Sequence, residues 1–121
     1  MIQILIGGFL IAHGLVHLAV WATPKQPDAP FDASDSWLLG PTKGLSMVLA
    51  VVAAVVLVAG GIALFADVAV WQPLTIAGLA VSLLLDVLYF NLWFGFITMV
   101  NAVFLAMLIL ANWSPIVSDG V

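Results

Sequence analysis

This sequence has few charged residues and no cysteine. Charged residues make up 7% of the 121 positions, and arginine and glutamate are absent; a soluble domain usually carries about 25% charged residues. This number of charges is too small to cover a water-facing surface. A lipid bilayer is therefore the solvent that suits the chain. The missing cysteine excludes disulfides and thiolate metal sites. Because Lys25 and Lys43 are the only strong bases, no basic patch is available, which excludes a nucleic-acid partner.

Apolar residues account for 65% of the chain and form four long runs, at about residues 2–22, 45–66, 71–90 and 94–113. A membrane-spanning helix needs about 20 such residues, and its backbone must be hydrogen-bonded internally. The runs lack the period-2 alternation of a β-barrel. Short connections between the later runs place neighbouring helices antiparallel. We therefore predict one all-α domain over residues 1–121, an integral membrane up-down bundle of four transmembrane helices.

The first connection, residues 23–44, is predicted to be a long, polar, proline-rich loop. Within it, "FDASDSWLLG" favours a short interfacial helix, with Asp32 or Ser34 as the N-cap and Trp37 at headgroup depth. Both lysines lie in this connection, so the positive-inside rule places the loop in the cytoplasm. The expected location is a bacterial inner membrane. We interpret the first apolar run as a retained helix, since it lacks the charged leader and cleavage site of a secretory signal.

Polar residues inside these apolar runs are the candidate site. The first helix carries both histidines, His13 and His17, four residues apart; the third aligns Ser82 with Asp86, and the fourth carries Asn101. At about 1.5 Å of rise per residue, His17, Asp86 and Asn101 fall roughly 6–10 Å inside helix ends that face the long loop. These residues are therefore expected in one band of the membrane, where they would bind a ligand or handle protons.

Each candidate also has a structural interpretation. A carboxylate in a spanning helix usually faces the bundle interior and marks a site, but Asp86 could instead hydrate near the interface or be protonated. The histidines could hydrogen-bond across helices, polarise a ligand or move protons beside Asp86, or bind a metal or haem. His13, His17 and Asp86 together would form a two-histidine, one-carboxylate metal set. Asn101 is more often an interhelical hydrogen-bonding residue than a catalytic one.

The opening "ILIGGFLIAHGLVHL" resembles the first helix of small four-span bacterial membrane proteins of the DoxX-like group. Their "G-x-x-x-x-x-H-G" pattern is approached by Gly8, His13 and Gly14, with one position fewer between glycine and histidine. The resemblance covers about 15 residues and the four-span layout, and it implies quinone or thiol redox chemistry. This chain departs from the pattern, because His17 stands where a basic residue often follows and no redox cysteine exists.

The sequence therefore favours a non-enzymatic accessory or interaction subunit, or a small homo-oligomer. Its expected partners are the bilayer, other membrane subunits and further copies of itself. The alternative is a membrane-embedded small-molecule site for a quinone, a lipid, a proton or a metal, built from His13, His17, Asp86 and Asn101. No cofactor is expected under the first interpretation, and a metal or quinone is expected only under the second. Standard hydrolase, kinase and dinucleotide motifs are absent.

Overall fold

Four long helices make up almost all of the described structure. The computed structural model describes residues 1–23, 27–28 and 32–116. Its helices are α1 (Ile2–Trp21), α2 (Lys43–Phe65), α3 (Trp71–Leu88) and α4 (Gly95–Leu110), the last preceded by the 3₁₀ turn η1 (Leu92–Phe94). Each of them, with η1 counted as part of the fourth, is long and apolar enough to cross a membrane. The all-α prediction with four candidate spans is confirmed.

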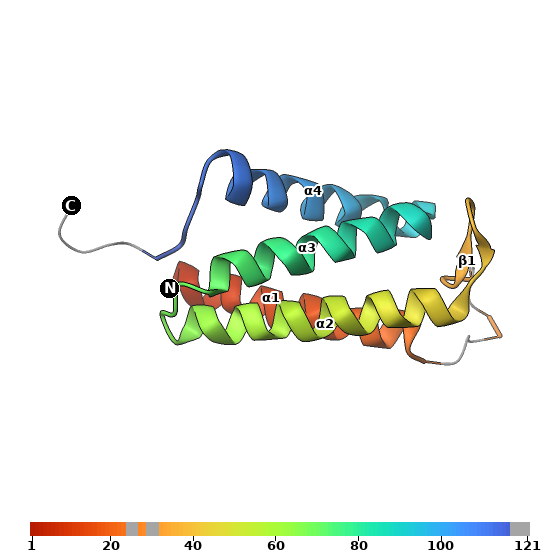
Figure 1. The fold of residues 1–121 in the computed structure, drawn as a ribbon, viewed down its shortest axis with the longest axis horizontal. Coiled ribbons are helices and arrows are strands. Elements are labelled where there is room, and N and C mark those ends of the chain that lie inside the picture. The colour runs from red at the N-terminus through yellow and green to blue at the C-terminus, as the bar shows by residue number, and fades with distance from the viewer. Residues whose placement is uncertain (24–26, 29–31, 117–121) are drawn as a thin grey trace.

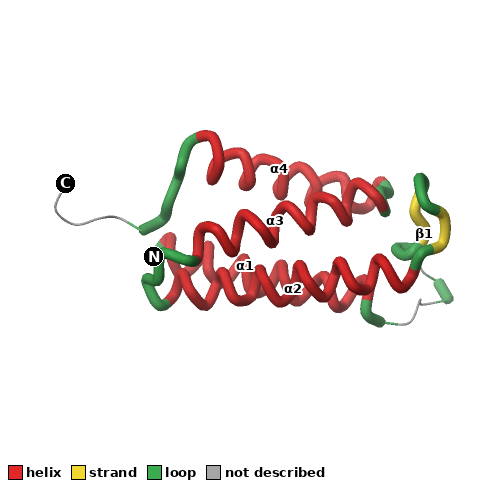
Figure 2. The backbone as a smooth tube through the Cα atoms, in the orientation of Figure 1, coloured by secondary structure: helices red, strands yellow, loops and turns green. Residues whose placement is uncertain are grey.

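The helices pack in chain order, α1 against α2, α2 against α3, and α3 against α4 (Figure 1). α3 and α4 lie close together near η1 and diverge toward the C-terminal end of α4 (Figures 1 and 2). α2 is the central helix, with 44% of its most apolar window buried, whereas only 11% of the corresponding α4 window is buried. α4 is therefore the peripheral helix of the bundle.

Glycine allows α1 and α2 to approach closely. A Cβ atom built on Gly61 would lie 2.8 Å from the Gly7 carbonyl oxygen, and one on Gly14 would lie 3.0 Å from the Ala54 carbonyl oxygen. Small residues at these positions let two helix backbones pack directly, which is how helices associate where lipid removes the hydrophobic drive between them.

Two apolar clusters divide the interior along the helix axes. One contains Leu10, Leu57, Leu79 and Phe104, and the other contains Trp21, Ala50, Leu85, Tyr89 and Phe94. The clusters take different segments of α1, α3 and α4. The buried polar residues His13 and His17 on α1 and Ser82 on α3 lie between them in the chain.

The described part of the connection between α1 and α2 does not form the predicted interfacial helix. Two short strands, β1 (Asp35–Ser36) and β2 (Gly40–Pro41), pair antiparallel instead. Gly40 has φ +76°, which suits a turn, and the Ser36 hydroxyl accepts from the backbone N–H groups of residues 38 and 39. The predicted cap Asp32 accepts from the Ser34 N–H and hydroxyl, which stabilises a turn rather than a helix start. Lys25 and Phe31 lie outside the described residues.

The hairpin is tied to the C-terminal end of α3. Ser36 donates to the Leu88 carbonyl, and the Trp37 indole N–H donates to the Val87 carbonyl at 2.7 Å. Tyr89 and Thr42 share a hydrogen bond of 2.6 Å between their hydroxyls. The bonds from Ser36 and Trp37 satisfy backbone carbonyls that the end of α3 leaves without helical partners.

The third and fourth helices end earlier than predicted. α3 stops at Leu88 rather than near residue 90, since the Asn91 side chain accepts from the Trp93 N–H and starts η1. α4 stops at Leu110 rather than near residue 113. There, Asn112 adopts φ +47° and the Trp113 N–H donates to the Met107 carbonyl, which folds the chain back.

The close approach of α1 and α2 predicts the effect of adding one methyl group. Gly61→Ala should lower the free energy of unfolding by about 1–3 kcal/mol, the usual cost of overpacking, because its Cβ meets backbone. Denaturant unfolding in mild detergent measures the change. Gly8→Ala is the matched control, since nothing lies within 4 Å of a Cβ at Gly8. Equal stability of the two variants would contradict this packing.

Candidate functional site

Five buried polar side chains from three helices meet between the two apolar clusters. We call them the buried polar network: His13 and His17 from α1, Ser82 and Asp86 from α3, and Asn101 from α4. His13 is 7% exposed and the other four are at most 2% exposed. Helix periodicity brings together His13 and His17, which are four residues apart, and helix packing brings together partners that are 15 to 88 residues apart.

Asn101 is the centre of this network. Its side-chain oxygen Oδ1 lies 2.8 Å from His13 Nε2. Its amide nitrogen Nδ2 donates to Ser82 Oγ at 2.9 Å and to Asp86 Oδ2 at 2.7 Å. One amide therefore joins α4 to both α1 and α3, and it uses both amide hydrogens and its oxygen to do so.

The contacts determine which atom of each pair donates. His17 Nδ1 lies 2.7 Å from the His13 backbone oxygen, which can only accept, so Nδ1 carries a hydrogen. In a neutral imidazole the other nitrogen then accepts, which assigns the 2.7 Å contact of His17 Nε2 to the Ser82 hydroxyl as donor. Ser82 in turn accepts from Asn101, and Asn101 accepts from His13 Nε2–H. The bonds form a closed ring through His13, Asn101, Ser82 and His17, with Asp86 attached at Asn101.

Aromatic rings extend the network along α1. The Phe9 ring stacks on His13 with centroids 5.3 Å apart, and His17 stacks on Trp21 at 5.7 Å. The two imidazoles meet edge to face at 4.9 Å. Phe9 and Trp21 were not predicted as neighbours of the site. Their spacing could have revealed them, because four residues separate each ring from the next along one helix face.

The structure brings all five predicted polar residues together and decides how they pair. His17 faces Ser82 and not Asp86, and Asp86 joins the network through Asn101. Among the described residues, no group of three or more histidine, cysteine, aspartate or glutamate side chains is placed to hold a metal ion. The expected metal set of His13, His17 and Asp86 is therefore not assembled, because the carboxyl group points to the amide of α4.

The chemistry of these contacts favours a structural role over proton transfer. The amide nitrogen of Asn101 has no basic lone pair, so it cannot accept a proton from Asp86 and pass it to Ser82. The hydrogen-bonded path from the carboxyl group to the histidines is interrupted at this atom. In the described part of the chain, every buried side-chain nitrogen and oxygen has a hydrogen-bond partner. The network therefore satisfies itself without a ligand.

Comparison with known proteins adds no relative: no family model, curated protein or solved structure matches this chain. The resemblance of its first helix to the DoxX-like group stays a prediction.

The central position of Asn101 predicts a large effect of its removal. Asn101→Leu should lower the free energy of unfolding by about 2 kcal/mol, since three hydrogen bonds are lost at about 0.6 kcal/mol each within a membrane bundle. Unfolding in mild detergent measures it.

Thr98→Val is the matched control on α4, because the Thr98 hydroxyl bonds only to the Phe94 carbonyl of its own helical segment. It should change stability by less than half as much. If Asn101→Leu were as stable as Thr98→Val, the network would not hold α4 in place.

Proposed function

We propose that this chain is a four-span integral membrane protein of a bacterial inner membrane that acts by association rather than by catalysis, as an accessory subunit or a small homo-oligomer. The four apolar helices support membrane insertion. Large apolar side chains on their outer faces, such as Val55 at 63% and Phe96 at 73% exposed, suit contact with lipid or with another membrane helix.

The observation that carries the non-enzymatic part of the proposal is the closed buried polar network. A substrate, metal or quinone bound at His17 or at the Asn101 amide would have to break a hydrogen bond that the protein already makes. Breaking such a bond leaves a buried polar group unpaired, which costs about 1–3 kcal/mol. The network instead suits a protein whose helices must keep one arrangement while their outer faces meet partners.

Single introduced cysteines can test the topology, because the native chain contains no cysteine that would also be labelled. Asp28 and Ala69 are exposed and lie in connections at opposite ends of the up-down bundle. A membrane-impermeant maleimide should label Asp28→Cys only in inside-out vesicles and Ala69→Cys only in right-side-out vesicles, since the lysine-bearing loop is expected in the cytoplasm.

The two cysteine variants control for each other. Labelling of both from one side would contradict the proposed crossing of the membrane by α2, the helix that separates the two positions. The reverse assignment would contradict the cytoplasmic loop and leave the four spans intact.

Association is tested by native mass spectrometry after extraction in a mild detergent. We expect a mass of at least two copies, or of one copy with another membrane protein, which a harsh detergent reduces to the single chain. A monomer that carries no other protein in both detergents would contradict the proposal.

A further inference from the structure

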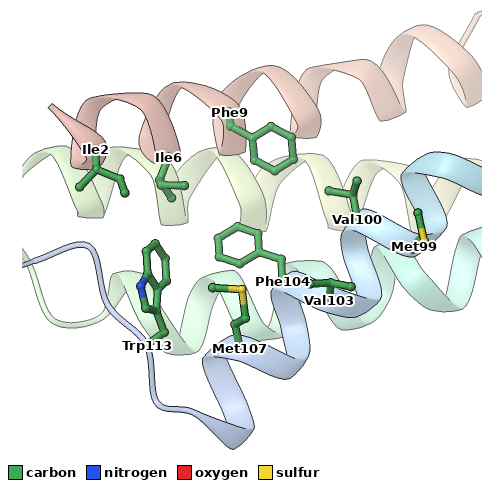
Figure 3. Close-up of a pocket in the computed structure, with 9 residues that line it drawn as sticks. All are labelled: Ile2, Ile6, Phe9, Met99, Val100, Val103, Phe104, Met107 and Trp113. Carbon is green, nitrogen blue, oxygen red and sulfur yellow. The ribbon is translucent and has the colours of Figure 1, made fainter.

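A second feature of the bundle lies apart from the polar network, on the side where α1 and α4 face each other. A pocket of about 450 Å³ opens there. Its walls are Ile2, Ile6 and Phe9 from α1 and Met99, Val103 and Met107 from α4. Trp113, which follows α4, stands at one end, the rings of Phe9 and Phe104 point toward one another in the middle, and Val100 and Met99 lie beyond them (Figure 3).

We propose that this pocket is a binding site for one hydrocarbon chain of a membrane lipid. This inference rests on the membrane insertion proposed above, because the pocket lies between two candidate spans and opens sideways from them. In a bilayer such an opening faces acyl chains rather than water. The lining offers no charged side chain, so an occupant gains from dispersion and apolar contact alone.

The size of the pocket selects a single chain over a helix. At about 30 Å³ for a group the size of a water molecule, 450 Å³ holds about fifteen methylene-sized groups. A helix with its side chains is about 10–12 Å across, so a single turn would fill the whole space. A second copy or a partner helix could therefore cover the pocket only from outside, whereas an acyl chain fits within it.

The residues along the pocket indicate the direction in which the bound acyl chain runs. From Ile2 to Phe9 the wall is about 10 Å long at 1.5 Å per residue, and Trp113 stands at the end near the N-terminus of α1 (Figure 3). Tryptophan is enriched at the level of lipid headgroups. The headgroup therefore lies outside at Trp113, and the first part of the acyl chain runs inward toward the Phe9–Phe104 pair.

The polar network is closed to this occupant. His13 is the nearest network residue along α1, and its Nε2 is bound to Asn101 while Phe9 stacks on its ring. The Phe9 and Phe104 centroids are 6.2 Å apart, so these rings separate the pocket from the network. The ligand class is thus a plain acyl chain and not a molecule with a polar head at His13.

Photolabelling tests the site in the full-length protein. The protein is reconstituted in phosphatidylcholine vesicles that contain a trace of phosphatidylcholine with a diazirine near the glycerol end of one acyl chain. After irradiation, adducts are located by mass spectrometry. We expect at least threefold more adducts on the pocket residues of α1 and α4 than on the outer face of α2 around Ile62. Ile62 is exposed, lies outside the pocket and follows Gly61, which packs against Gly7 at the depth of the pocket.

A substitution that fills the pocket with a larger side chain gives a second test. Val103→Trp should reduce pocket adducts at least threefold, and Val55→Trp, at a similarly exposed valine, should leave them unchanged. Adducts spread equally over α2 and the pocket in the native protein would overturn the site without the need for either variant. In that outcome adducts on α2 would still support membrane insertion, whereas no adducts on any helix would contradict insertion itself.

A cysteine pair distinguishes a lipid from a second copy. Under mild oxidation, Val103→Cys should form no more disulfide-linked dimer than Val55→Cys. More dimer from Val103→Cys would show that another copy occupies the pocket and would overturn the proposal.

Discussion

The arrangement of α4 depends on the three hydrogen bonds of the Asn101 amide. Helices in lipid gain little from burying apolar surface against each other, because lipid tails are as apolar as leucine. α1, α2 and α3 compensate with close glycine contacts, but α4 is peripheral and little buried. A central amide that bonds His13, Ser82 and Asp86 at once gives α4 a defined depth and rotation against its neighbours.

The position of the network explains why the two apolar clusters stay separate. Polar groups in a hydrocarbon environment must find partners within the protein, so five of them gather in one layer. The apolar side chains above and below then pack independently, with Leu10 and Phe104 on one side and Trp21 and Phe94 on the other. On the first side α4 diverges from α3, and the pocket opens between α1 and α4. There Gln72 on α3 still donates to the Leu108 carbonyl and to the Asn112 side chain at the end of α4.

The part of the bundle that fixes the helices is therefore separate from the faces that are exposed. One layer holds the helices in register, and the remaining outer faces are free to meet lipid or other membrane helices. A pocket beside the buried polar network suits a protein that binds hydrocarbon without disturbing its own core. The interruption of the proton path at Asn101 fits the same interpretation, since the network connects helices rather than compartments.

The apolar runs determined the number and class of the helices, because the backbone of an apolar stretch of about 20 residues can satisfy itself only as a helix in lipid. Helix periodicity and depth also placed His13, His17, Ser82, Asp86 and Asn101 in one band. The hairpin at Asp35–Pro41 and the helix ends at Leu88 and Leu110 were missed, since they depend on side chains such as Ser36, Asn91 and Asn112 bonding to nearby or distant backbone.

Only the tertiary structure decided which polar groups pair. Helix periodicity gives the face of a residue but not the rotation of one helix against another, and a rotation of a few tens of degrees decides whether His17 meets Asp86 or Ser82. The structure selected Ser82 and placed an amide between the carboxyl group and the histidines. The pocket likewise arises from the divergence of α4, a relation between residues about 95 positions apart in the chain that no local pattern encodes.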